Sequence, residues 1–226
     1  PETTRCDGVT TYYRKGKVCH CSSKRPPGSR EERDRRRAAR TLNQRQRSSV
    51  FALVSRLVKI LTRKLRDLNA WVSLAKATNM TPANLCHKVN GTACDENGVA
   101  NFRAFIFSVG WLAVPLFTRD TRRGWEITIE WRPHGVPNET RDKDTLVIGY
   151  FYDSLPDAPR VLHLPNVTRA GRVATFTLPD PVTATGKPLS PDEIVHLYPY
   201  VAGSGQDEFS TSVYLRVARD VDEILG

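Results

Sequence analysis

The second half of the chain is a series of short β-prone runs separated by turn-rich segments, and this pattern constrains the fold most. In residues 125–132, "WEITIEWR", apolar residues alternate with polar ones, which is the pattern of a strand with one buried face. No helical pattern interrupts the series. The expected strands are 101–109, 125–132, 144–153, 160–164, 171–178, 193–202 and 210–219. This spacing predicts an antiparallel β-sandwich of the immunoglobulin or fibronectin type.

The N-terminal residues predict a basic hairpin arm. Two β-prone runs within residues 9–20 flank the segment "RKGK", in which Gly16 supplies a permissive turn position. Pro26 and Pro27 then break regular structure, because consecutive prolines continue neither a helix nor a sheet.

A helix is expected to follow the arm. The stretch "GSREERDRRRAARTLNQRQR", residues 28–47, holds eight arginines, but Ser29 and Glu32 have the spacing of a capping box. Acidic residues in its first turns suit the positive end of the helix dipole. The arginines therefore belong to an ordered helix rather than a loose tail, and the same helix is expected to continue into the next segment.

That next segment has one apolar face and one basic face. The apolar positions follow helical spacing and are Val50, Val54, Leu57, Leu61, Leu65 and Leu68. Arg56, Lys59, Arg63 and Arg66 repeat with the same period on the opposite side. The segment 66–80 is expected to extend or follow this helix. Thr81 and Pro82 resemble a cap and first helical position, and they predict a short helix that ends at about Val89.

These expectations combine into an α+β fold of three regions. They are a basic hairpin arm (1–28), a helical region (29–100) and a β-sandwich (101–226). No stretch of about 18 apolar residues occurs, so no membrane span is expected. The N-terminus lacks the pattern of a signal peptide, and the five cysteines have no disulfide-framework spacing, so a cytoplasmic protein is expected.

The positive charge belongs to the first third of the chain. Residues 1–70 hold 19 Lys and Arg against 6 Asp and Glu, a net charge of +13. Residues 71–226 hold 15 against 18, a net of −3. Such asymmetry indicates an anionic partner, either nucleic acid, with DNA and RNA not distinguished, or an acidic protein surface. A solvated helix surface with no partner is the alternative. The expected nucleic-acid-binding residues are Arg30, Arg33, Arg35, Arg36, Arg37, Arg40, Arg45, Arg47, Arg56, Lys59, Arg63 and Arg66.

Catalytic and metal-binding patterns are weak. The triplet Cys19-His20-Cys21 invites a metal site, but its spacing is not that of a zinc knuckle, and reduced structural cysteines are favoured. No phosphate-loop or nucleophile-elbow motif occurs, and "VAGSGQ" at 201–206 fits a hairpin loop. His163 and His196 lie in expected strands, where packed or surface histidines are favoured. We expect no cofactor and no enzymatic activity.

Several segments resemble an uncharacterised family of Bacteroidota proteins that is known only as a domain of unknown function. The similar segments are "GVTTYYRKGKVCHCSSKRPP", "TLNQRQRSSVFALVSRLV", "ITIEW", "DTLVIGYFYD" and "IVHLYPYVAGSGQDEFSTSVYL". The resemblance implies a bacterial, non-secreted protein with a β-sandwich and implies no activity. The sequence thus predicts a non-enzymatic nucleic-acid-binding protein with a basic arm and an interaction domain. The alternative is an assembly subunit or homo-oligomer whose arm docks on a neighbouring chain.

Overall fold

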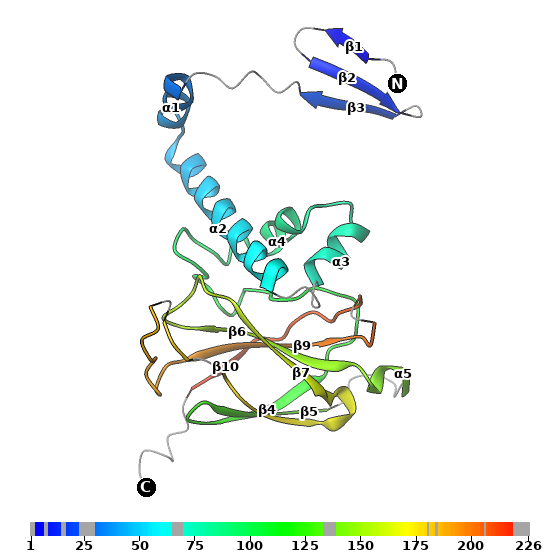
Figure 1. Ribbon diagram of the computed structural model, residues 1–226, viewed down its shortest axis with the longest axis vertical. Coiled ribbons are helices and arrows are strands. Elements are labelled where there is room, and N and C mark those ends of the chain that lie inside the picture. The colour runs from blue at the N-terminus through cyan, green and yellow to red at the C-terminus, as the bar shows by residue number, and fades with distance from the viewer. Residues whose placement is uncertain are drawn as a thin grey trace. The chain divides into compact units, whose positions relative to one another are not determined.

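The computed structural model describes residues 3–6, 9–14, 17–22, 30–64, 70–132, 139–179, 181–183, 185–205 and 207–218. The chain divides into two compact units, Pro1–Arg45 and Gln46–Gly226 (Figure 1).

The first unit contains a three-stranded antiparallel sheet and a helix. The strands are β1 (Thr3–Cys6), β2 (Val9–Arg14) and β3 (Lys17–Ser22), and the helix is α1 (Arg30–Ala38). β2 lies between β1 and β3. It pairs with β3 along the segment for which the sequence predicts a hairpin, with Tyr12 opposite Cys19. Ser29, the expected N-cap of the helix, lies outside the described residues.

The basic helix is interrupted, so the expectation of one continuous helix is wrong. α1 ends at Ala38, and a second helix, α2, spans Leu42–Lys64. At its start the Thr41 side-chain oxygen accepts a hydrogen bond from the Gln44 backbone N–H (3.3 Å). The Gln44 side-chain oxygen in turn accepts one from the Thr41 N–H (3.1 Å). This reciprocal pair is a capping box, which satisfies the backbone donors of a new helix and so favours a break at residues 39–41.

The apolar face of α2 is a core face. The expected positions Val50, Val54, Leu57 and Leu61 are all buried, which confirms this part of the prediction. Leu53 and Val58 widen the buried stripe. Leu65 and Leu68 lie outside the described residues.

Two short helices follow, α3 (Ala70–Ala77) and α4 (Pro82–Asn90). The predicted cap of α4 is confirmed, because the Thr81 side-chain oxygen accepts a hydrogen bond from the Asn84 backbone N–H (3.2 Å) and Pro82 occupies the first turn. Threonine provides an acceptor for an otherwise unpaired N–H, and proline lacks the N–H that would have no partner there.

Seven strands of the second unit form two antiparallel sheets. They are β4 (Leu116–Arg123), β5 (Glu126–Arg132), β6 (Thr145–Tyr152), β7 (Arg160–Thr168), β8 (Val173–Thr177), β9 (Val195–Ala202) and β10 (Leu215–Val217). One sheet has the order β10-β9-β6-β7 and the other β4-β5-β8. A short helix, α5 (Glu139–Asp142), precedes β6, and a 3-10 turn, η1 (Arg169–Gly171), joins β7 to β8. The α+β class is confirmed.

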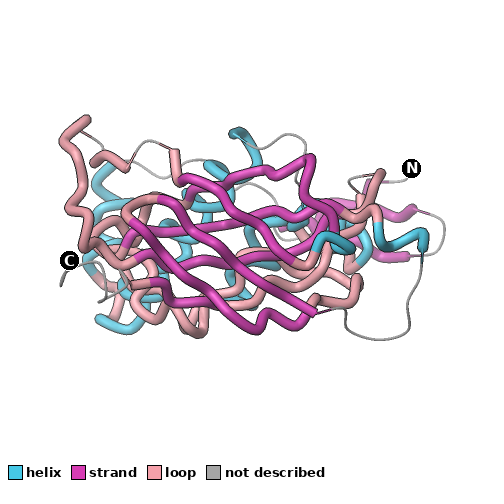
Figure 2. Tube along the Cα trace, turned by 90° about the horizontal axis from the view of Figure 1, so that it is seen from below, coloured by secondary structure: helices cyan, strands magenta, loops and turns pink. Residues whose placement is uncertain are grey.

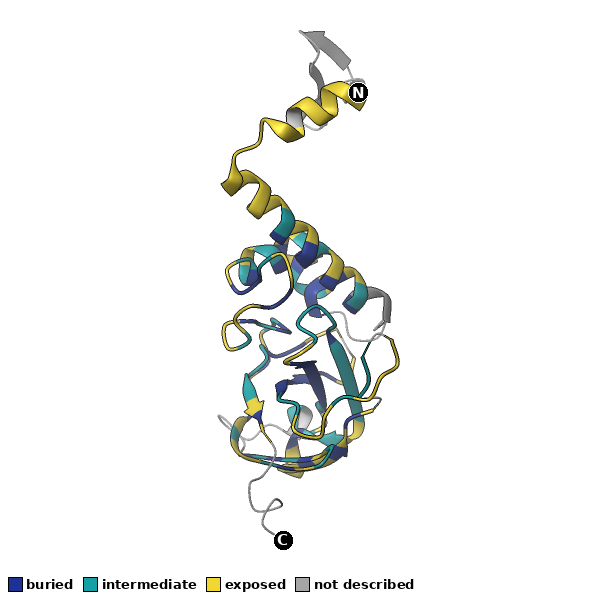
Figure 3. Ribbon diagram, turned by 90° about the vertical axis from the view of Figure 1, so that its left-hand side faces the viewer, coloured by how far each residue is buried: buried dark blue, intermediate teal, exposed yellow. Residues whose placement is uncertain are grey.

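The two central strands of the four-stranded sheet, β6 and β9, are buried on both faces. On one face, Ile148 of β6 and Leu197 of β9 pack in one cluster with Ile127 of the other sheet. On the opposite face, Phe151 and Tyr198 pack in a second cluster with residues of α2, α3 and α4. Figures 1 and 3 show the helices on one side of this sheet, β4 and β5 on the other, and the buried residues between them. Figure 2 shows the paired strands running side by side.

Gly149 of β6 permits the close approach of the irregular segment 101–109 to this sheet. A Cβ atom at residue 149 would lie 2.4 Å from ring atoms of Phe107, a buried residue of the aromatic cluster. We therefore expect Gly149→Ala to lower the free energy of unfolding by about 1–3 kcal/mol, the usual cost of overpacking a core. Urea denaturation of the variant measures this change. A matched change at Gly171, where an added Cβ would meet nothing within 4 Å, should cost less. Equal losses at the two positions would contradict the account.

Residues 101–109 do not form the expected strand. The Asn101 backbone oxygen accepts hydrogen bonds from the N–H groups of Ala104 and Phe105, so the chain turns here. The Asn101 side-chain oxygen also accepts from the Ala104 N–H (3.1 Å). Phe105 and Phe107 are buried as part of this irregular segment. An apolar run shows that a segment is buried, but it does not distinguish a strand from a turn packed on the core.

Strand β4 was not expected, and β10 is shorter than expected. β4 lies at the edge of its sheet and carries the exposed charged residues Arg119, Asp120 and Arg123, so its sequence resembles a loop. Charged residues are common on edge strands, where they oppose pairing with other chains. β10 covers three residues of the expected run 210–219. Ahead of it, Ser210 donates its N–H to the Val201 carbonyl outside the regular ladder.

Candidate functional site

The arginines of α1 are exposed. Arg30, Arg33, Arg35 and Arg37 all lie on the surface, and the side chain of Arg36 is not described. Figure 3 shows the described residues of this helix as exposed all round. Because residues at i, i+3 and i+7 share one face of a helix, Arg30, Arg33 and Arg37 form a single row of cations. We call these three residues the α1 arginine row.

The acidic residues of α1 neutralise this row only weakly. Arg37 lies 3.9 Å from Asp34, and both side chains are more than half exposed. Exposed ion pairs of this kind contribute little, typically under about 1 kcal/mol. The Arg37 guanidinium can therefore exchange Asp34 for another anion at small cost.

Arg45 has a structural role at the turn between α1 and α2. Its guanidinium donates hydrogen bonds to the carbonyl oxygens of Ala38 (2.8 Å) and Arg40 (3.1 Å). These carbonyls belong to the last turn of α1 and the residues after it. A cation at this place satisfies the unpaired carbonyls that a helix end leaves. Arg40 itself is exposed.

The expected basic stripe of α2 is only partly described. Arg56 and Lys59 are exposed, whereas the side chain of Arg63 and all of Arg66 lie outside the described residues. Arg56 forms an ion pair with Asp157 (3.3 Å) in the loop between β6 and β7. The expected binding residues are thus divided, with Arg30 to Arg45 in the first unit and Arg47, Arg56 and Lys59 in the second.

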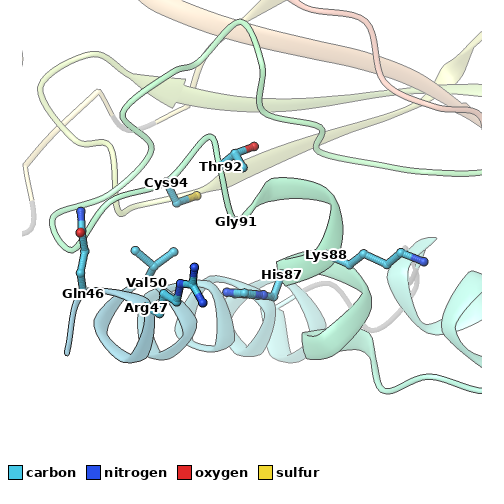
Figure 4. Close-up of a pocket in the computed structure, with 8 residues that line it drawn as sticks. All are labelled: Gln46, Arg47, Val50, His87, Lys88, Gly91, Thr92 and Cys94. Carbon is cyan, nitrogen blue, oxygen red and sulfur yellow. The ribbon is translucent and has the colours of Figure 1, made fainter. Parts of the chain in front are cut away.

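A pocket of about 550 Å³ opens between α2, α4 and the segment that follows α4. Its size is within the range of small-molecule sites, roughly 300–1,000 Å³. Figure 4 shows Arg47 and His87 on the same side of it, Thr92 and Cys94 opposite them, and Lys88 extending away. The lining residues are Gln46, Arg47, Val50, His87, Lys88, Gly91, Thr92 and Cys94. Of these, the sequence prediction named only Arg47.

The pocket has a positive lining. Arg47 and Lys88 are cations, and no carboxylate is among the lining residues. Within the described part of the chain, the side chains of Arg47, Lys88, Gln46 and Thr92 make no hydrogen bond or ion pair. The His87 ring lies edge-on to Phe51, with ring centres 5.1 Å apart. The donors of the pocket are therefore available to a ligand.

Gly91 and Cys94 shape the pocket without supplying a nucleophile. A Cβ atom at residue 91 would lie 2.6 Å from the His87 carbonyl oxygen, so only glycine fits against the end of α4. Burial raises the pKa of the Cys94 thiol to about 11, and the neighbouring Asp95 carboxylate adds to the effect. At neutral pH this thiol stays protonated, and the thiol is a poor nucleophile compared with the thiolate.

His196 is a packed histidine, as expected. It is buried, and its ring is stacked on Phe102 with centres 3.7 Å apart. Its two nitrogens lie 3.0 Å from the Tyr214 hydroxyl and 2.9 Å from an Asp153 carboxylate oxygen. Burial lowers the pKa of His196, and its hydrogen bond to the Asp153 carboxylate opposes this shift. Both nitrogens therefore have partners. The contact with Tyr214 fastens the chain before β10 to the sheet, and the stacked Phe102 ring fastens the 101–105 turn.

The next question is whether the described side chains could bind a metal ion. Among the described residues, no group of three or more His, Cys, Asp or Glu side chains could hold a metal ion. Nothing is described of the side chains of Cys19, His20 and Cys21 in β3. No helix in the described ranges is long and apolar enough to cross a membrane.

No protein-family model matches this chain, and no curated protein sequence matches it significantly. The resemblance to the Bacteroidota family stays a prediction.

Proposed function

We propose that this is a non-enzymatic nucleic-acid-binding protein that uses α1 to contact the phosphate backbone. The observation that carries the proposal is the exposure of the α1 arginine row on a helix with no buried described side chain. A helix that is polar all round gains nothing from packing on a core, and nine residues are too few for a helix to be stable by itself. A polyanion along the row would stabilise it.

The spacing of the row suits a phosphate backbone. Seven residues of helix span about 10 Å, and the phosphates of one DNA strand follow each other along the axis at about 3.4 Å. Arginine also presents a planar fork of donors that matches two phosphate oxygens. Contacts of this kind read the backbone and not the bases, so we expect binding that tolerates any sequence and weakens steeply with salt.

The second unit is proposed as an interaction domain of the fibronectin type. One sheet, β4-β5-β8, joins the first, second and fifth strands of the unit. The other, β10-β9-β6-β7, joins the seventh, sixth, third and fourth. This arrangement matches the sandwich of fibronectin type III domains. The helical layer over the outer face of its four-stranded sheet is an addition to that plan. Such sandwiches serve widely as binding modules, and this supports an interaction role beside the basic helix.

Binding to random-sequence DNA and RNA oligonucleotides tests the proposal. Fluorescence anisotropy at about 50 mM salt should show binding by the intact protein. The triple variant Arg30→Gln, Arg33→Gln and Arg37→Gln should bind about tenfold or more weakly, because each charged hydrogen bond to phosphate contributes on the order of 1 kcal/mol.

The matched control removes the same number of exposed arginines from the second unit. Arg103→Gln, Arg123→Gln and Arg132→Gln lower the net charge by the same amount. This control should bind almost as tightly as the intact protein. Equal weakening in both triple variants would show that net charge alone, and not the position of the α1 arginine row, determines the affinity. No binding by the intact protein would reject the proposal.

A further inference from the structure

The pocket beside α4 has the composition of an anion site that is separate from the α1 arginine row. All its lining residues belong to the second unit, whereas the row belongs to the first. In the described chain Arg47 and Lys88 have no acidic partner, and an unpaired cation in a concave site attracts anions more strongly than one on a convex surface.

The number of donors favours phosphate over carboxylate. Arg47 supplies charge on the wall of the pocket, Lys88 adds a cation that extends from its rim, and Gln46 and Thr92 supply neutral donors. A phosphate monoester carries a charge of about −1.5 to −2 at neutral pH and three strong acceptor oxygens. A carboxylate has one charge and two oxygens, so it would leave more of these donors without a partner.

The remaining wall of the pocket fits an organic group. Val50 is a buried apolar residue, and the Cys94 thiol is buried and uncharged at neutral pH. The His87 ring, held edge-on by Phe51, adds a flat surface. A free phosphate ion would occupy the cationic part and leave this wall empty, whereas an ester of phosphate with an apolar or aromatic group would contact both.

We propose that the pocket binds a phosphate monoester, with the phosphate on Arg47 and the ester's organic group against Val50 and Cys94. This site does not depend on nucleic-acid binding by α1. It gives the second unit a small-molecule ligand of its own.

Titration by NMR with phenyl phosphate as the probe tests this site. Phenyl phosphate should shift the backbone amide signals of Gly91 and Thr92 with saturation. Benzoate, which has the same ring with a carboxylate, and inorganic phosphate, which lacks the ring, should each bind at least about tenfold more weakly. Equal binding of benzoate would overturn the choice of phosphate, and equal binding of inorganic phosphate would overturn the role of the apolar wall.

Variants localise the site. Arg47→Gln changes an exposed side chain that has no partner in the described structure, so the fold should survive, and it should weaken phenyl phosphate binding about tenfold. Lys76→Gln and Arg123→Gln, which are exposed elsewhere in the same unit, should leave it unchanged. The triple variant of the α1 arginine row should also bind phenyl phosphate normally. Unchanged affinity in Arg47→Gln, or no saturable shift in the intact protein, would reject the site.

Discussion

Replacing Arg122 by alanine should lower the free energy of unfolding by at least about 3 kcal/mol. Arg122 is 1% exposed and lies on β4. Its guanidinium donates to the carbonyl oxygens of Gly124 (2.7 Å), Pro191 (3.0 Å) and Glu193, and its central carbon lies 4.8 Å from the centre of the Trp125 ring. Removal leaves three carbonyls without their donors, each at a cost of about 1–3 kcal/mol, and it also removes the contact with the Trp125 ring.

The neighbouring residue provides the control for this prediction. Arg123 follows Arg122 on the same strand, but it points to the opposite side and is exposed. Arg123→Ala should change the free energy of unfolding by no more than about 0.5 kcal/mol. Arg122→Lys should fall between the two, because one ammonium group cannot reach the positions of a planar fork. Urea denaturation gives all three values, and similar losses for Arg122→Ala and Arg123→Ala would contradict the structural role.

Replacing Asp144 by alanine should cost about 3–5 kcal/mol, the usual effect of breaking a buried ion pair. Asp144 lies before β6 and pairs with Arg169 of η1 (3.1 Å), and the two side chains are 1% and 9% exposed. Burial raises the pKa of Asp144, and the Arg169 guanidinium opposes this shift without cancelling it. The aspartate is thus stabilised as an anion chiefly by its partner, and in the alanine variant the arginine would remain buried without one.

A double variant separates the pair from its individual charges. Asp144→Leu combined with Arg169→Leu removes both charges and fills part of their volume with apolar atoms. It should be less destabilised than Asp144→Ala, because exchanging a buried pair for apolar residues is often close to neutral. The backbone oxygen of Arg169 would still accept the hydrogen bond from the Trp131 indole (2.8 Å). A double variant that is less stable than the single one would show that the ion pair is a net stabiliser.

The sequence predicts individual elements better than the layer that each element joins. The alternation around Ile127 and Ile129 identifies β5, and Thr81 with Pro82 identifies the start of α4, because both signals are local. A simple two-layer sandwich predicts that β9 is buried on one face only, whereas β9 is buried on both. The nearly unbroken apolar run "VHLYPYVA" is typical of a strand covered on both sides. Which helices cover it depends on contacts distant in sequence.

The candidate site shows the same limit. Exposure of the α1 arginines follows from a segment without large apolar residues. The spacing of Thr41 and Gln44 is that of a capping box, so the break between the two helices also has a local signal in the sequence. In contrast, Arg122 and Arg123 are adjacent and chemically identical, yet one is buried and the other exposed. The pocket joins Arg47 to residues more than forty positions later, and no local motif marks it.

The salt dependence of duplex DNA binding tests the central claim most directly. For the intact protein the logarithm of the association constant should fall linearly with the logarithm of salt concentration. Replacing the α1 arginine row by glutamines should make the slope shallower by about one per arginine, roughly three in all, whereas the control with Arg103, Arg123 and Arg132 replaced should keep the original slope. An unchanged slope in the α1 variant would contradict phosphate binding by this helix.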